Sequence, residues 1–309
     1  MTHLSIVEPG TLMGEAVRDS LASRGEDWDQ VELFSASTDE KGAVTEVAGR
    51  AALVQPLEED SLHGADVVLF CSSELDTQIL ELVPDTARAI LIDPDTAVPE
   101  AIPVVAGINT VETATAARIV SPSPALILLS RLLHSLAQQG DVEMVAHVLQ
   151  PASARDRAGL DELFDQTRSI LSMSEQQHYE IFGTQLAFNL LPWKGSDESL
   201  ATDLETILGR KLEAEIYLSQ AGVFHCCSAG IFLRLGSDPG TEALRGLLEE
   251  SPHIETHDEP DLLGPVAAAA AKKILLGPVT ASPTKGYWIW CVMDNLACSA
   301  DNALAIARY

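Results

Sequence analysis

The chain contains 309 residues, 46% of them hydrophobic and 21% charged, a composition typical of one large or two smaller globular domains. Its 46 acidic and 19 basic residues give a formal net charge of −27, which would repel nucleic-acid phosphates and anionic membrane surfaces. No apolar run approaches the roughly 20 residues that span a bilayer, and Met1–Ser5 lacks the basic region of a signal peptide. We therefore expect a cytoplasmic protein that binds neither nucleic acid nor a membrane.

Apolar strands and helices alternate in the first part of the chain. His3–Val7 predicts a strand, Glu8-Pro9-Gly10 a tight turn, and the helical spacing of apolar residues up to Arg24 a helix. Further strands are predicted at Val31–Phe34, Ala65–Cys71 and Ala89–Ile92, a helix at Thr77–Val83, and extended structure at Ile102–Val105. This alternation predicts a Rossmann-like, doubly wound parallel sheet over residues 1–125.

The pattern changes after the loop Ser121–Pro124 and the apolar helix Ala125–Leu136. Longer, alternating strands predict an antiparallel or mixed sheet, and hence a second, α+β domain over residues 126–290. The final helix, within residues 291–309, is expected to return to the first domain. The predicted strands are Glu143–Leu149, Gly222–Cys227, Gly230–Leu235 (broken from the previous one near Ser228) and Gly286–Val292, and the predicted helices are Ala158–Leu171, Ser199–Leu212, Thr241–Glu250 and Ala300–Ala307.

The cysteines predict buried, reduced thiols. Their number is odd and their spacing contains no CxxC motif, so neither a disulfide framework nor a metal site is expected. Cys226 and Cys227 are adjacent, and on a strand their side chains would point to opposite faces. The five positions are Cys71, Cys226, Cys227, Cys291 and Cys298. Tyr287, Trp288 and Trp290 alternate along a predicted strand, which favours packing within the sheet over ligand stacking.

Four local strings, in this order along the chain, resemble the aspartate-semialdehyde dehydrogenase family. Ala89–Asp93 is similar to the family's VIDNS strand, Leu149–Ser153 to its YQAVSG turn, Ala187–Pro192 to its AFNxIP segment, and Met293–Leu296 to its ADNL string. The resemblance implies a Rossmann-like NAD(P)-binding-type domain, followed by an α+β domain that provides dimerisation and, in the family, catalysis.

The resemblance fails at the nucleophile. Family enzymes attack the aldehyde with a cysteine thiolate at the start of a helix, in the string NPNCST. The matching stretch here is Ser121–Leu126, which places Pro124 at the nucleophile position. Proline has no ionisable group but starts a helix well, so the local structure can survive without the reaction.

The dinucleotide loop also departs from the family's GATGAVG string. The matching residues run from Glu8 to Gly14, and include Gly10, Thr11 and, at its family position, Gly14. Glu8 is expected to place a carboxylate where a pyrophosphate would lie, so Gly10 and Gly14 are better explained by a tight turn. Ser72 and Ser73 follow the strand where the family is rich in glycine, and Pro94-Asp95-Thr96 and Pro99 replace further binding residues. No cofactor is expected.

In the second domain, Gln150 keeps the position of a family residue that orients the reacting centre. An alignment with the family without a gap places Cys227 at the position of the acid/base histidine. His225 reaches this position only if a gap is introduced into the alignment. Of the substrate-binding Lys and Glu expected near residues 196–199, Glu198 alone remains.

We interpret the chain as a non-catalytic paralogue that resembles the Usg-type proteins of this family: a homodimer with a binding or scaffold role and an unknown partner. One alternative is an active oxidoreductase of amino-acid biosynthesis that uses NADP, acts on aspartate semialdehyde or a related aldehyde or acyl phosphate, and has a relocated nucleophile such as Cys71 or Cys227. Another is a small-molecule sensor without turnover. A heterodimer with an active paralogue also remains open.

Overall fold

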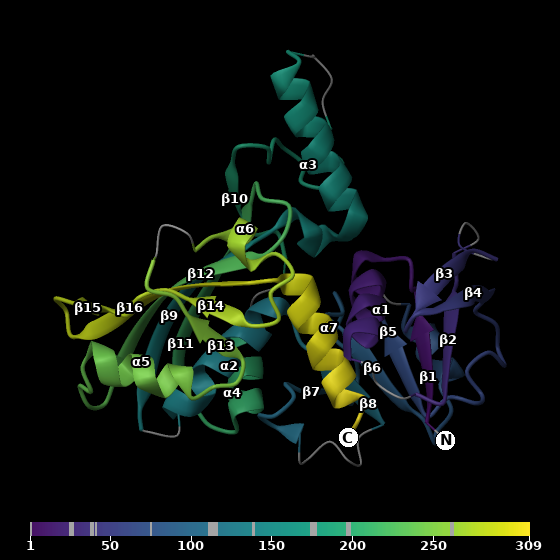
Figure 1. The fold of residues 1–309 in the computed structure, drawn as a ribbon, viewed down its shortest axis with the longest axis horizontal. Coiled ribbons are helices and arrows are strands. Elements are labelled where there is room, and N and C mark those ends of the chain that lie inside the picture. Colours follow the sequence, from purple (N-terminus) through teal and green to yellow (C-terminus); the bar gives the residue numbers. More distant parts are fainter. Residues whose placement is uncertain are drawn as a thin grey trace. The chain divides into compact units, whose positions relative to one another are not determined.

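The computed structural model describes residues 2–24, 28–37, 40, 42–74, 76–110, 117–137, 140–173, 178–195, 199–259 and 263–309. The chain divides into two compact units (Figure 1). Unit 1 consists of Met1–Ile127 and Ser299–Tyr309, and unit 2 of Leu128–Cys298. No helix in the described part of the chain is long and apolar enough to cross a membrane.

Unit 1 is built on one sheet with the strand order β3-β4-β2-β1-β5-β6-β8-β7. All neighbouring strands are parallel except the hairpin of β3 and β4. The elements are β1 His3–Val7, α1 Leu12–Arg24, β2 Gln30–Ser35, β3 Val44–Val47, β4 Arg50–Pro56, β5 Val67–Phe70, the 3-10 helix η1 Thr77–Leu82, β6 Arg88–Ile92, β7 Ile102–Pro103 and β8 Arg118–Ser121. The predicted Rossmann-like sheet is therefore confirmed.

Both faces of the unit 1 sheet are apolar, as continuous apolar strands require. One face packs against α1 and against the helix α7, Asn295–Ile306, through residues such as Val17, Leu21 and Leu304. The other packs against η1 and the loop around Leu62. Asn302 is buried in α7, accepts the amide of Ala106 at 2.9 Å and donates to the Ser121 hydroxyl at 2.9 Å, which joins the C-terminal helix to the sheet.

Unit 2 contains a mixed sheet with the order β10-β11-β9-β12-β16-β14-β13, and β15 pairs with β16. The predicted α+β architecture is confirmed. Its elements are α2 Pro124–Ala137, β9 Val142–Gln150, η3 Ala152–Arg155, α3 Asp156–Leu171, β10 Leu190–Pro192, α4 Leu200–Leu208, β11 Glu213–Ala221, β12 Cys227–Leu235, α5 Thr241–Glu249, β13 Ile254–Thr256, α6 Pro265–Ala268, β14 Ile274–Leu276, β15 Thr280–Ser282 and β16 Gly286–Met293.

The two faces of the unit 2 sheet differ in exposure. Figure 1 shows α2, α4 and α5 on one side of the sheet and α3 on the other. Along β9, Met144, Ala146 and Val148 are buried, whereas Val145 and His147 between them are exposed. We call the second side the open face; its apolar and aromatic residues are Val145, His147, Tyr217, Phe232, Trp288 and Trp290.

Helix α3 is joined to the loop that follows it by buried polar side chains. The Glu162 carboxylate accepts the amides of Ile181 and Phe182 at 2.6 and 3.1 Å. The side-chain oxygen of Gln166 accepts the backbone amides of Leu186 and Ala187 at 2.6 and 3.0 Å. The side-chain NH2 group of Gln166 donates to the backbone carbonyls of His178 and Thr184. Because Glu162 and Gln166 are only 5% and 3% exposed, these bonds compensate for the burial of two polar groups.

Several predicted elements were wrong in detail. Gly222–Cys227 is not a strand, and the following strand is unbroken from Cys227 to Leu235, because it pairs with β9 on one side and β16 on the other. Cys226 has φ 71°, which is incompatible with a strand, so the expectation that Cys226 and Cys227 point to opposite faces of a strand does not apply. The predicted helix Ser199–Leu212 ends at Leu208, where Gly209 takes the left-handed conformation that caps helices.

Other elements were missed or displaced. The strands β3, β4, β8, β10, β11, β13, β14 and β15 were not predicted, and η1 is a 3-10 helix. The last helix begins at Asn295 because the Asp294 carboxylate accepts the amides of Leu296 and Ala297.

Candidate functional site

The turn after β1 begins helix α1 with its own capping group. The Thr11 hydroxyl accepts the amide of Gly14 at 3.0 Å and donates to the carbonyl of Cys71 at 2.9 Å, which links the turn to the end of β5. A Cβ on Gly14 would lie 2.6 Å from the carbonyl oxygens of Glu8 and Pro9. Gly14 is therefore required for close packing of the helix against the turn.

Two carboxylates occupy the region where parallel-sheet proteins of this type bind phosphates. Glu8 has φ 58°, and its side chain accepts the Ser35 hydroxyl and the Ala36 amide, both at 2.8 Å. The Glu8 side chain therefore lies against the end of β2, whereas the sequence analysis expected it at the position of a pyrophosphate. The carboxylate at the turn itself belongs to Glu40, which lies so close to Gly10 that a side chain on Gly10 would require the Glu40 side chain to move.

The segment after β5 is held by local hydrogen bonds. The Ser72 hydroxyl donates to the carbonyl of Glu74 at 3.3 Å, and the Ser73 hydroxyl to the carboxylate of Asp95 at 3.1 Å. Cys71 is 3% exposed. Burial, with a further contribution from the Glu8 carboxylate, raises the pKa of the Cys71 thiol to about 12.

Pro124 is the first residue of helix α2, as the sequence predicts. Ser123 caps this helix, because the amide of Ile127 donates to its carbonyl at 3.0 Å and the amide of Leu126 to its hydroxyl at 3.4 Å. Proline fits this position since it needs no hydrogen-bond acceptor for an N–H group. The start of the helix, where the resemblance expects a thiolate, carries an apolar and buried ring.

In unit 2, Gln150 ends strand β9 and is 4% exposed. Its backbone carbonyl accepts the side-chain amide of Gln220 at 3.0 Å. Its own side-chain carbonyl oxygen is buried without a hydrogen-bond partner among the described residues. Glu198 lies outside the described residues.

The turn between β11 and β12 is positioned by Asn295. The side-chain oxygen of Asn295 accepts the backbone amide of Cys226 at 3.0 Å, and its side-chain NH2 group donates to the Ser153 hydroxyl at 3.1 Å. Asn295 belongs to the Met293–Leu296 string that carries the family resemblance, and its role here is to hold this turn. His225 is exposed on the turn, whereas Cys227 points into the core, where its sulfur lies 3.6 Å from the carbonyl of Met293.

The remaining thiols are buried. Burial raises the pKa of Cys226 and of Cys291 to about 12, and that of Cys227 well above the ordinary value for a thiol. All five cysteines are free and buried, as predicted. Because the thiolate is the nucleophilic form, none of the four thiols whose pKa is raised is activated in this structure. The described residues contain no group of three or more potential ligands arranged to hold a metal ion.

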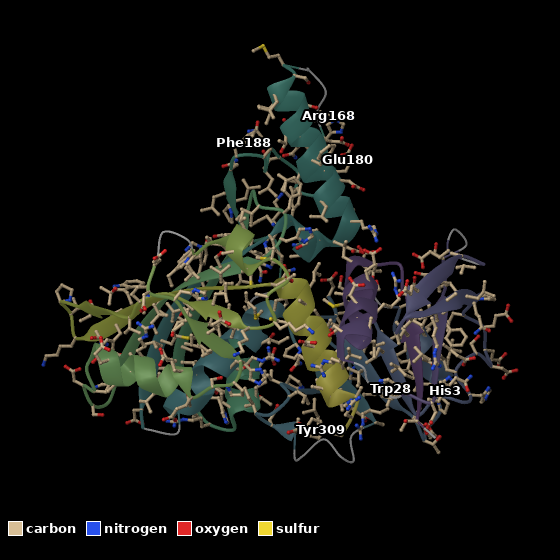
Figure 2. The ribbon with its side chains drawn as sticks, in the orientation of Figure 1. His3, Trp28, Arg168, Glu180, Phe188 and Tyr309 are labelled. Carbon is tan, nitrogen blue, oxygen red and sulfur yellow. The ribbon has the colours of Figure 1, made fainter. Side chains whose placement is uncertain are left out.

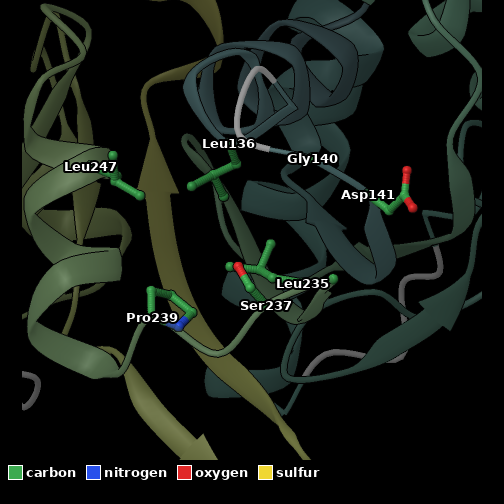
Figure 3. A pocket seen from close by; sticks show the side chains of 8 residues that line it. Leu136, Gly140, Asp141, Leu235, Ser237, Pro239 and Leu247 are labelled. Carbon is green, nitrogen blue, oxygen red and sulfur yellow. The ribbon is translucent and has the colours of Figure 1, made fainter.

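Unit 2 also contains a small pocket, with a volume of about 310 Å³ (Figure 3). Leu136 of α2, Leu235 of β12 and Leu247 of α5 line it, together with Pro239. Asp141 is the one titratable residue among the lining residues, and its side chain is fully exposed. Ser237 adds one hydroxyl group, and the other side chains of the lining are apolar.

The sequence analysis did not predict the roles of two polar residues, one in each unit. Glu40 lies 30 positions after Gly10, in a polar stretch that no pattern connects with the first turn. The role of Asn295 was detectable only as part of a similar string, because its partners Ser153 and Cys226 are distant in sequence.

A Rossmann-like unit followed by a mixed-sheet unit defines a two-unit α/β protein of the dehydrogenase type. The sequence model of the family described as "Semialdehyde dehydrogenase, dimerisation domain" matches residues 133–298, which is more than half of the chain. The chain belongs to this semialdehyde dehydrogenase family.

Known relatives and structures agree with this assignment. The chain is 26% identical to an aspartate-semialdehyde dehydrogenase of Rickettsia conorii over 80% of each protein. It is 27% identical to one of Rickettsia bellii over 62% of this chain and 61% of the relative. Its fold is similar to aspartate semialdehyde dehydrogenase II of Vibrio cholerae, with a TM-score of 0.88 at 20% identity over 99% of this chain and 97% of that one. A probable aspartate-semialdehyde dehydrogenase of Pseudomonas aeruginosa gives a TM-score of 0.89 at 21% identity over the same shares.

Proposed function

We propose that this chain is a catalytically inactive member of its family, similar to Usg-type paralogues, which acts as a dimeric binding or scaffold protein. The observation that carries the proposal is Pro124 at the first position of α2. In the family resemblance, this position supplies the thiolate that forms the covalent intermediate. Proline cannot form such an intermediate, and Gln150 without a nucleophile has no reacting centre to orient.

The turn after β1 supports the same proposal. A dinucleotide pyrophosphate would meet the Glu40 carboxylate at Gly10, while the Gly14 amide is already bonded to Thr11. Two like charges about 4 Å apart repel by about 1–4 kcal/mol, depending on screening. The residues of this chain do not fit the phosphate groups of NAD or NADP, so we derive no hydride transfer from them.

The alternative of an active oxidoreductase with a relocated thiol lacks support from the geometry. Cys71 and Cys227 are both buried and both have a raised pKa. The Cys227 sulfur contacts the backbone carbonyl of Met293. Among the described residues, it forms no hydrogen bond with His225. A buried neutral thiol without a neighbouring base is a poor nucleophile.

We expect no phosphorylating oxidation of aspartate semialdehyde when the purified protein is assayed with NADP and phosphate. The rate should equal that of a blank without enzyme, because the covalent step has no activated thiol. The Rickettsia conorii relative, assayed in parallel, controls for the substrate preparation. A rate clearly above the blank that disappears in Cys71→Ser or Cys227→Ser would contradict the proposal.

We expect NADP and NAD to bind more weakly than about 1 mM, equivalent to about −4 kcal/mol. In calorimetry, Glu40→Gln should bind NADP more tightly than the wild-type chain, because one negative charge at the turn after β1 is removed. Glu180→Gln, on the surface of unit 2 (Figure 2), is the charge-matched control and should change nothing. A micromolar site in the wild-type chain would show that this loop does accept phosphates.

The open face of unit 2 is the surface that we assign to dimerisation. Val145, Tyr217 and Trp288 on this face are 51%, 55% and 50% exposed. The rings of Phe232 and Trp288 lie 5.3 Å apart on neighbouring strands, and those of His147 and Tyr217 lie 5.4 Å apart. Half-exposed apolar and aromatic side chains grouped on one face favour burial against another subunit. A two-fold axis would bring the open faces of two copies together. The partner is a second copy of this chain or a related paralogue.

A further inference from the structure

Unit 2 exposes an uncharged segment between α3 and α4. The chain has no charged residue between Glu180 and Lys194, although 21% of all its residues are charged. Ile181, Phe188 and Leu190 in this segment are nevertheless 41%, 69% and 52% exposed. Charged residues are depleted at the centre of protein–protein interfaces, where aromatic side chains are enriched. In a chain with a net charge of −27, exposed apolar residues without any charge among them therefore indicate an interaction surface.

The exposed ring of Phe188 is carried by a fixed turn. Phe188 has φ 60°, a left-handed conformation that residues other than glycine rarely adopt. The side chain of Asn189 donates to the carbonyl of Gln185 and accepts the amide of Leu190, both at 2.9 Å. The backbone carbonyl of Asn189 accepts the amide of Gly222 at 3.0 Å. Because these bonds hold the backbone in place before binding, little entropy is lost when the ring is buried by a partner.

The same segment continues the open face of the unit 2 sheet. In the antiparallel pair of β10 and β11, Leu190 lies opposite Ala221 and Pro192 lies opposite Ser219. Ala221, Ser219 and Tyr217 are two positions apart along β11, so their side chains point to one face of the sheet. Tyr217 is part of the open face, and Leu190 and Pro192 therefore extend this face to the edge strand β10.

We call α3 together with residues 178–190 the arm. Figure 2 shows Phe188 on the β10 side of α3, whereas Arg168 and Glu180 lie on the opposite side. Arg168 forms an ion pair with Asp165 at 2.9 Å. The arm therefore has a charged outer side and an uncharged side that adjoins the open face, so a partner seated on the open face can also contact Phe188.

The occupant that these observations favour is a second copy of this chain. The family model described as a dimerisation domain matches residues 133–298, which include both the open face and the arm. In a two-fold dimer each chain supplies both halves of every contact. The arm of one copy and the open face of the other are apolar surfaces of the same molecule, so they can cover one another without a further component.

We propose that the arm forms a second contact region of the dimer, in which Phe188 and Leu190 of each copy pack against the other copy. This inference rests on the proposed dimerisation through the open face and adds a separate set of residues to it. Phe188 is the anchor of this contact, because it combines a large exposed ring with a fixed backbone.

Photo-cross-linking of the full chain tests the contact directly. Phe188 is replaced by p-benzoylphenylalanine, and the protein is irradiated at moderate salt and micromolar concentration. We expect covalent pairs of chains with twice the mass of one chain. The same replacement at Arg168, on the outer side of the arm, is the control and should leave single chains.

A second measurement is the dissociation constant of the dimer, obtained by light scattering over a dilution series. Phe188→Asn removes the ring, and the fold should be kept because asparagine adopts positive φ more readily than phenylalanine does. We expect dimerisation to weaken about 30-fold or more, since the anchor is lost twice in a two-fold dimer. Arg168→Asn is the matched control and should dimerise as the wild-type chain does. Circular dichroism of both variants establishes that the fold is kept.

The outcomes separate this inference from the open-face dimer on which it rests. A dimer that Phe188→Asn leaves unchanged, or one in which the replaced Phe188 joins no chains, would overturn the contact of the arm. If Trp288→Glu still dissociates that dimer, dimerisation through the open face holds without the arm. A wild-type chain with the mass of a monomer would overturn both.

Discussion

Replacement of Gln166 by leucine is expected to lower the free energy of unfolding by about 3 kcal/mol or more. The substitution leaves the amides of Leu186 and Ala187 and the carbonyls of His178 and Thr184 without their present partner. Each buried polar group left unpaired costs about 1–3 kcal/mol. Since a folded protein is stable by only about 5–15 kcal/mol, the loss is a large part of the total.

Urea unfolding followed by circular dichroism measures this loss, and the midpoint should move to lower urea concentration. The matched control is Gln78→Leu in η1, because the Gln78 side chain is exposed and the change should stay within about 0.5 kcal/mol. Equal stability of the two variants would show that the loop after α3 finds other partners.

Introduction of a charge at Trp288 is the second change with a large expected effect. Trp288→Glu places a carboxylate on the open face, beside Phe232. In a two-fold interface the substitution occurs twice, and the loss of one tryptophan buried in the interface costs about 2 kcal/mol or more. A total of roughly 4 kcal/mol weakens dimerisation about 1000-fold, so the variant should be monomeric at micromolar concentration.

Light scattering at moderate salt distinguishes the two states, because the chain mass is 33.0 kDa and the wild-type protein should have twice this mass. The wild-type dimer should also loosen at low salt, since the net charge of −27 is then less screened. Leu53→Glu is the control, because Leu53 is 54% exposed in unit 1. A wild-type mass near that of the monomer would remove both the dimer and the role that we assign to the open face.

Much of the fold could be predicted from the sequence because its signals are local. The apolar runs His3–Val7 and Ala89–Ile92 bury both faces of their strands, and this requires a covered parallel sheet wherever the strands lie. Pro124 is equally local, since a proline side chain carries no thiol in any tertiary context. The assignment of Gly14 to a tight turn is local for the same reason, because a short turn before a helix allows few conformations.

Strands with weaker local signals were missed. Most positions of Val44–Val47 and Arg50–Pro56 are exposed or half-buried, so their apolar pattern is weak. Strand propensity also depends strongly on the neighbours in the sheet. The turn at Cys226 was read as a strand because its sequence is apolar. Its conformation depends on a hydrogen bond from Cys226 to Asn295, 69 residues away.

The sequence by itself therefore determined the class of fold, the family and the absence of a nucleophile at Pro124, because each follows from residues close together in the chain. Only the tertiary structure decided that Glu40 lies at Gly10, and which face of the unit 2 sheet stays open. Alternation along a strand shows that its two faces differ. What covers each face depends on elements far away in the sequence, whose positions are set by packing.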